Sequence, residues 1–295
     1  MIETLGERIW SVNSGVEGPS FGISFGVHGD ERAPIDAGLA LKDELESGAL
    51  ALERGRLLLF HGNPRATEEN RRATAAGVDL NRCFHPSVLG REPELLEEHR
   101  AREIAAAIES TGCEALVDFH CTVEPGQRFL MQHPPVADEA HQRVFSFLRA
   151  EILLSDPDMN FGGVSLDEYM STRGRVGICY ETGWLGDPAN TPESAGEEMR
   201  NLLAGMGLIS SPEAKVYGSK RLLEMVAAQI CEEEGFRWDD GIGQNLQALD
   251  AGTRLGAYAS GREITLDRDT TLIFPKKRPE LMVVGKPLVY LSVQR

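Results

Sequence analysis

Short apolar runs alternate with longer amphipathic segments through the first two thirds of the chain. Runs in which nearly every residue is apolar are typical of strands buried on both faces of a sheet, and we expect such strands at residues 21–27, 57–60, 115–119 and 176–180. The segments between them carry apolar residues at helical spacing, which predicts helices over residues 35–45, 94–108, 136–148 and 193–206. Pro34 and Gly48 suit the two ends of the first helix.

This alternation predicts an α/β fold with a mixed, mostly parallel sheet flanked by helices. The pattern changes after residue 206, where strand-like pieces such as residues 271–274 and 288–291 alternate with glycine-rich turns. We therefore expect a larger α/β domain over residues 1–206 and a smaller β-rich domain over residues 207–295. Because sites in parallel sheets lie beyond the carboxyl ends of the strands, the larger domain is expected to carry any active site.

Charge and cysteine content narrow the class of protein. The 295 residues include 46 acidic and 30 basic side chains, a formal net charge of −16, which disfavours binding to nucleic acid or to an anionic membrane. No apolar run is long enough to span a bilayer, and the first residues lack the features of a signal peptide. The five scattered cysteines form no Cys-x-x-Cys pair, so we expect a reduced, cytoplasmic protein.

Three candidate metal ligands follow two of the predicted strands. His28 and Glu31 come just after residues 21–27, and Gly29 lets the chain bend tightly between them. His120 follows residues 115–119, and Asp118 is placed to orient it. Two histidines and one carboxylate, with a fourth position open to water, are the ligands of a hydrolytic zinc centre. The sequence therefore predicts one zinc ion per chain.

Other polar residues could complete a reaction site around the metal. Glu181 ends the strand at 176–180 and precedes a glycine turn, so its carboxylate could act as a base over the pocket. Arg65 and Arg82 lie in polar loops of a strongly acidic chain. Arginine binds carboxylates bidentately and stabilises oxyanions, so these two residues are candidates for holding an anionic substrate.

Taken together, these segments resemble the succinylglutamate desuccinylase/aspartoacylase family of the zinc carboxypeptidase clan. The resemblance covers roughly residues 20 to 185, and it rests on five short motifs in the expected order: His28-x-x-Glu31, Asn63-Pro-Arg65-Ala, Asp79-Leu-Asn81-Arg82, Asp118-Phe-His120 and Glu181-Thr-Gly183. It implies that His28, Glu31 and His120 bind zinc. It also implies a zinc-carboxypeptidase-like fold for the catalytic domain.

The resemblance further implies roles for the remaining residues. Glu181 would be the general base and then the general acid, and Arg65 would polarise the scissile carbonyl. Asn81 and Arg82 would hold a substrate carboxylate, and Arg173 or Arg175 would add a further contact. The tyrosine that aspartoacylase brings from its second domain has no aligned match, although Tyr258 and Tyr290 are available.

The function expected from this resemblance is a zinc-dependent amidohydrolase that cleaves a small anionic N-acyl amino acid with metal-activated water. A metallocarboxypeptidase acting on peptides would use the same ligands and the same Asn-Arg pair, but it would need an open cleft. A third possibility is a metabolite-binding protein without catalytic activity. A homo-oligomer is compatible with each of these alternatives.

Overall fold

The structure is a computed structural model, and it describes residues 1–133, 139–156, 164–210 and 214–295. Its main sheet has twelve strands in the order β1-β2-β4-β3-β5-β8-β6-β7-β9-β15-β14-β11. A three-stranded sheet has the order β10-β12-β13. The strands are β1 (Ile2–Gly6), β2 (Ile9–Asn13), β3 (Ser20–Phe25), β4 (Arg56–His61), β5 (Ala115–Thr122), β6 (Phe129–Gln132), β7 (Ile152–Ser155), β8 (Val176–Trp184), β9 (Arg221–Ile230), β10 (Arg237–Trp238), β11 (Ala248–Leu249), β12 (Arg254–Ala257), β13 (Glu263–Thr265), β14 (Thr270–Ile273) and β15 (Pro287–Gln294).

The helices occupy the segments in which the apolar spacing predicted them, with several short additions. They are α1 (Arg32–Ser47), α2 (Pro64–Glu68), α3 (Pro86–Leu89), α4 (Leu96–Thr111), α5 (Glu139–Ser146), α6 (Leu166–Ser171) and α7 (Pro192–Gly205), with two 3₁₀ turns, η1 (Leu80–Arg82) and η2 (Pro279–Leu281). The predicted helix over 136–148 is observed as α5, and its first residues lie outside the described part of the chain. Gly48 ends α1 in the left-handed conformation that favours glycine.

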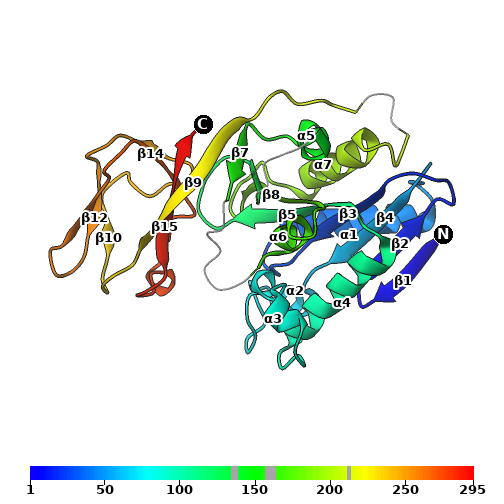
Figure 1. Cartoon of the computed structure of the whole chain (residues 1–295), viewed down its shortest axis with the longest axis horizontal. Coiled ribbons are helices and arrows are strands. Elements are labelled where there is room, and N and C mark those ends of the chain that lie inside the picture. Colours follow the sequence, from blue (N-terminus) through cyan, green and yellow to red (C-terminus); the bar gives the residue numbers. More distant parts are fainter. Residues whose placement is uncertain (134–138, 157–163, 211–213) are drawn as a thin grey trace.

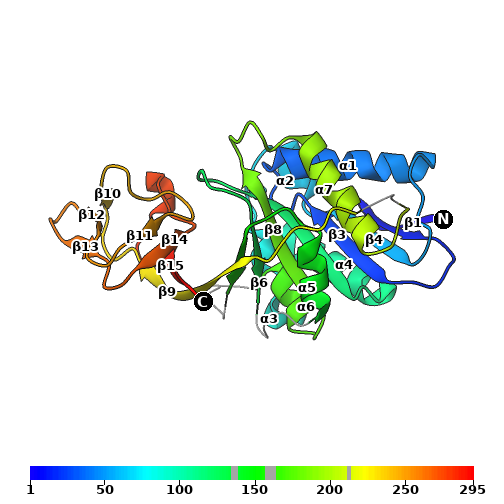
Figure 2. The same cartoon turned by 90° about the horizontal axis from the view of Figure 1, so that it is seen from above.

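The apolar runs are buried on both faces of the sheet because helices pack on each side. In β4, Leu57 and Leu59 join a core that includes residues of α1, α5 and α7. The alternate residues, Leu58 and Phe60, join a second core with residues of α4 and α6. Figure 2 shows α1 and α7 on one side of the sheet and α4 on the other. The pattern follows from the alternation of side chains along a strand.

Strand directions make one edge of the sheet the place where the ends of several strands meet. The central strands β4, β3, β5 and β8 run parallel, whereas the outer pairs β1–β2 and β2–β4 are antiparallel. The carboxyl ends of the parallel strands therefore lie together, as the sequence predicted for an α/β fold. The mixed α/β architecture with an additional β-rich C-terminal part is confirmed.

The β-rich C-terminal part, residues 221–295, is called the C-terminal lobe below. Its strand β9 pairs in parallel with β7 and antiparallel with β15, so the lobe extends the central sheet (Figure 1). It also has a hydrophobic cluster of its own, which includes Phe236, Leu255 and Leu272. The boundary at residues 206 and 207 stays a prediction. No helix in the described ranges has the length and apolarity required to cross a membrane.

Candidate metal centre and active-site pocket

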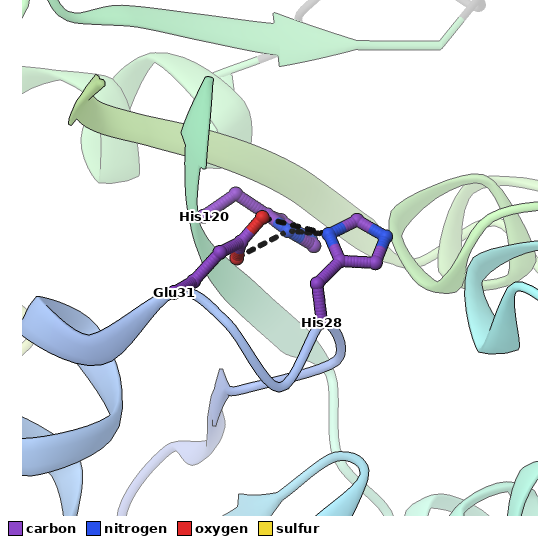
Figure 3. A group of neighbouring side chains, drawn as sticks. All are labelled: His28, Glu31 and His120. Atoms are coloured by element: carbon purple, nitrogen blue, oxygen red, sulfur yellow. Dashed lines mark hydrogen bonds and ion pairs between the residues drawn. The ribbon is translucent and has the colours of Figure 1, made fainter. Parts of the chain in front are cut away.

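Three buried side chains converge where β3 and β5 end side by side. His28 lies just beyond β3, Glu31 immediately precedes α1, and His120 lies near the end of β5. The Nδ1 atom of His28 is 2.7 Å from one carboxylate oxygen of Glu31, and the Nδ1 atom of His120 is 3.1 Å from the other. The two Nδ1 atoms are 3.2 Å apart (Figure 3). None of the three residues is more than 4% exposed.

These three residues fit a zinc ion by their donor atoms and spacing. Zinc bonds of about 2.0–2.1 Å in a tetrahedral centre separate neighbouring ligand atoms by roughly 3.3 Å. The observed separations of 2.7, 3.2 and 3.1 Å are close to that value, and the ligand atoms all lie within 4.8 Å of one another. Two facing imidazole nitrogens can share at most one proton between them, so a cation is the natural occupant of this point.

Carboxylates bond the opposite ring nitrogen of both histidines. The Nε2 atom of His120 lies 2.6 Å from Asp118, which is fully buried, and the Nε2 atom of His28 lies 3.2 Å from Asp79. In the neutral ring each carboxylate favours a proton on Nε2, which leaves the lone pair of Nδ1 for a metal. The outer contacts therefore select the tautomers that a metal requires.

The electrostatics of this cluster show an excess of negative charge around the two histidines. Burial alone would lower the pKa of His120, but Asp118 and Glu31 outweigh it and raise the pKa well above its usual value. Burial would likewise raise the pKa of Glu31, but His28 and His120 hold it at about 2. A divalent cation would balance the same carboxylates.

The cluster opens into a pocket with a volume of about 350 Å³. Both parts of the chain contribute to its walls. The ionisable and polar residues that line it include His28, Glu31, Arg72, Asn81, Arg82, His120 and Glu181 from the N-terminal part, and Asn245, Lys276, Lys286 and Tyr290 from the C-terminal lobe.

Glu181 lies in this pocket on β8, in register with His120 of the neighbouring β5. Its side chain is 7% exposed, and its Oε2 atom has no hydrogen-bond partner. Burial, reinforced by Glu31 and opposed by His120, raises the pKa of Glu181 to about 7. A carboxyl group with such a pKa can accept and return a proton near neutral pH.

Asn81 and Arg82 also line the pocket. The backbone N–H of Leu166 donates to the Oδ1 atom of Asn81 at 2.8 Å. This bond fixes the orientation of the amide and leaves its NH₂ group available as a donor. One guanidinium nitrogen of Arg82 donates to the backbone oxygen of Asn81 at 2.6 Å, which fixes the Arg82 side chain against the backbone of its neighbour.

Arg65 is not among the residues that line the pocket, whereas Arg72 is. Arg65 lies on α2, whose buried side is formed by Pro64 and Ala66, so its side chain points outward, is 59% exposed and pairs with Glu68 at 3.1 Å. Arg72 lines the pocket and donates to Asp79, the carboxylate behind His28, at 2.8 Å.

Arg173 and Arg175 lie at the amino-terminal end of β8, far from the side chains of His28, Glu31 and His120. Both precede β8, and Glu181 lies five residues beyond the first residue of that strand, or roughly 16 Å at the usual rise of a strand. The guanidinium of Arg173 stacks 3.5 Å from the ring centre of Tyr169, and both arginines pair with Glu109. Neither arginine is among the residues that line the pocket.

The C-terminal lobe contributes residues to the site that belong to no sequence motif. Tyr290 lines the pocket, whereas Tyr258 is buried in the hydrophobic cluster of the lobe, where its hydroxyl accepts from the backbone of Glu232 at 2.9 Å. Cys121 is a buried pocket residue, and its sulfur accepts from the amide of Asn190 at 3.1 Å. Lys276 had no motif around it that would have indicated a role in the site.

Comparisons of the sequence with known proteins identify the family to which the chain belongs. A model of the succinylglutamate desuccinylase/aspartoacylase catalytic domain matches residues 17–186. Succinylglutamate desuccinylase of Erwinia tasmaniensis is 44% identical over 62 residues, which cover 21% of this chain and 18% of that protein. Succinylglutamate desuccinylase of Paraburkholderia xenovorans is 35% identical over 112 residues, which cover 34% of this chain and 31% of that protein. The matches thus span less than a third of either relative.

A solved structure extends the likeness over nearly the whole chain. The structure described as succinylglutamate desuccinylase from Vibrio parahaemolyticus superposes with a TM-score of 0.77. The superposition covers 97% of this chain and 86% of that protein at 17% sequence identity. At this identity the likeness establishes the fold alone.

Proposed function

Because this chain belongs to the succinylglutamate desuccinylase/aspartoacylase family, we propose that it is a zinc-dependent hydrolase that removes the acyl group from a small N-acyl amino acid. The observation that carries the proposal is the convergence of three buried ligand atoms with the unpartnered Oε2 atom of Glu181 in one pocket. His28, Glu31 and His120 would hold the metal. When bound there, zinc would polarise the scissile carbonyl and make water a better nucleophile at neutral pH.

The side chains of the pocket supply the remaining steps. Glu181 accepts a proton from the attacking water and later donates it to the leaving amine, in keeping with its raised pKa. Arg72 takes the role first expected of Arg65 and stabilises the developing oxyanion, because it lines the pocket beside the metal cluster. Asn81 and Arg82 hold a carboxylate of the substrate.

Pocket size supports a small substrate over a peptide. The cavity of about 350 Å³ is bounded on one side by residues of the C-terminal lobe, including Phe274, Lys276 and Tyr290. A metallocarboxypeptidase needs an open groove for the rest of a peptide chain. The five cysteines are all buried and unpaired, which supports a reducing compartment such as the cytoplasm.

The proposal is tested by measuring the free amine released from acetyl, succinyl and formyl derivatives of aspartate, glutamate, arginine and neutral amino acids, together with several dipeptides. The zinc-loaded Glu181→Gln variant should lose on the order of 10²–10⁴-fold in rate and still bind zinc. Glu198→Gln is the matched control, since Glu198 is also a buried glutamate but lies outside the pocket lining. Undiminished hydrolysis by Glu181→Gln would remove this residue from the mechanism. Release from dipeptides alone would favour a carboxypeptidase.

A further inference from the structure

Lys276 places a cationic side chain of the C-terminal lobe in the pocket. It follows β14, and its backbone is held on both sides: its N–H donates to Leu288 O at 2.8 Å, and its carbonyl accepts from the indole N–H of Trp238 at 2.8 Å. The side chain is half-buried and lines the same cavity as Arg72 and Arg82. The ammonium group is therefore presented to the pocket by a fixed segment of backbone.

This ammonium group has no anionic partner in the described part of the chain, where no carboxylate lies within ion-pair distance of it. The same is true of Arg82, whose single side-chain bond goes to a backbone oxygen. Burial, together with Arg72 and Arg82, lowers the pKa of Lys276 to about 8. In a chain with 46 acidic and 30 basic residues, unpaired cations in one cavity indicate that an anion is the missing partner.

The backbone beside Lys276 adds an independent indication of a binding site. Phe274 lines the pocket with a φ of 52°, a left-handed conformation that is costly for a bulky residue. It is held there by Asn245, whose Oδ1 atom accepts the N–H of Phe274 at 2.8 Å. Asn245 itself lines the pocket and is 5% exposed, and its Nδ2 atom is buried without a partner. Strained backbone and an unused buried donor are typical of ligand sites.

We propose that Lys276 is a specificity-determining residue that binds the substrate carboxylate together with Arg82, so that the anionic group is held between the C-terminal lobe and the catalytic part of the chain. This inference rests on the proposed function and narrows it to N-acyl amino acids whose carboxylate is free. A substrate with a carboxamide in that position lacks the charge that the two cations share, and it leaves them unpaired.

The test compares kcat/KM for the best N-acyl amino acid with kcat/KM for its carboxamide, using the full zinc-loaded chain. Lys276→Met should reduce the preference for the acid on the order of 10- to 100-fold, and the change should appear in KM. This range corresponds to the free energy that a hydrogen bond to a charged group contributes to binding. Activity on the carboxamide should fall much less than activity on the acid, because the carboxamide carries no charge, and Lys276→Arg should restore most of the preference. Lys277→Met is the matched control: it removes a neighbouring exposed lysine that bonds a backbone oxygen outside the pocket.

Equal losses on acid and carboxamide, or an unchanged preference in Lys276→Met, would overturn the inference. Lys276→Gln gives the same comparison if the methionine variant fails to fold. If the wild type hydrolyses no member of the panel, the proposed function fails, and the binding inference is decided by calorimetry with glutarate. Weaker glutarate binding in Lys276→Met than in Lys277→Met would uphold the carboxylate site, and equal binding would reject it.

Discussion

Asp118→Asn is the substitution that most directly tests how the histidine ligands are oriented. Asp118 is fully buried, and its Oδ2 atom lies 2.6 Å from the Nε2 atom of His120. The carboxylate favours a proton on Nε2 and so leaves Nδ1 free to bind a metal. An asparagine can turn its NH₂ group toward Nε2, which moves the proton to Nδ1 and blocks the ligand atom.

The expected magnitude follows from the closeness of this contact. Loss of a carboxylate behind a histidine ligand weakens metal binding about 10- to 100-fold, or about 1.4–2.7 kcal/mol. We expect Asp118→Asn to fall within this range. Asp79→Asn should have a smaller effect, because Asp79 lies 3.2 Å from His28, is partly exposed and also pairs with Arg72.

The assay is competition for zinc against a chelator of known affinity, with thermal melting as a check of folding. Asp167→Asn is the matched control, because Asp167 is also fully buried and lies 3.1 Å from a histidine, His133, that is not among the candidate metal ligands. It should cost stability and leave zinc affinity unchanged. A folded Asp118→Asn protein that binds zinc as tightly as the wild type would refute the reasoning.

Three further predictions concern the turn, the oxyanion site and the carboxylate site. Gly29→Ala should lower zinc affinity and cost about 1–3 kcal/mol of stability, because the added Cβ would lie 2.1 Å from the backbone of α2. Thermal melting and zinc titration measure both effects, with Gly218→Ala as the control, since a Cβ added there meets nothing within 4 Å. Equal stability and zinc affinity in the two variants would contradict the prediction. Arg72→Ala should reduce kcat roughly 10²–10³-fold, whereas Arg65→Ala should keep a kcat near the wild-type value in the same steady-state assay. A larger loss of kcat in Arg65→Ala than in Arg72→Ala would return the oxyanion role to Arg65. The pKa of Lys276 is about 8, so its charge is present below that pH and lost above it. KM for the acid substrate should therefore rise between about pH 7 and pH 9, and an identical rise in Lys276→Arg would exclude this cause.

The convergence of His28, Glu31 and His120 could be predicted from the sequence because it depends on local rules. Apolar runs predicted strands β3, β5 and β8, and parallel strands place their carboxyl ends at one edge of the sheet. His28 follows β3, and His120 and Glu181 lie near the carboxyl ends of β5 and β8, so strand direction alone brings them together.

The arginine assignments depended on loop geometry, which has no comparable rule. Arg65 and Arg72 lie in the same polar stretch, and only the buried side of α2 decides which of them faces the pocket. Arg173 precedes Glu181 in the sequence, but most of the length of β8 separates the two residues in space.

The residues that the C-terminal lobe contributes to the pocket could not be predicted from the sequence, for a different reason. Lys276 and Tyr290 reach the pocket because β9 pairs with β7, a contact between segments far apart in the chain. Neither residue belongs to a motif, and the short strands of the lobe carry little periodicity. Their role follows from tertiary structure alone.

The pairing of β7 with β9 also bears on how proteins of this architecture can diverge. The residues that would hold the metal lie on β5 and in the turn between β3 and α1, elements packed into the two main cores. The opposite wall of the pocket belongs to a lobe with its own hydrophobic cluster. Substitutions in segments 274–276 and 280–290 can alter which molecule is accepted without repacking the elements that position the ligands. Selection or engineering can thus exchange the substrate while the chemistry is inherited unchanged.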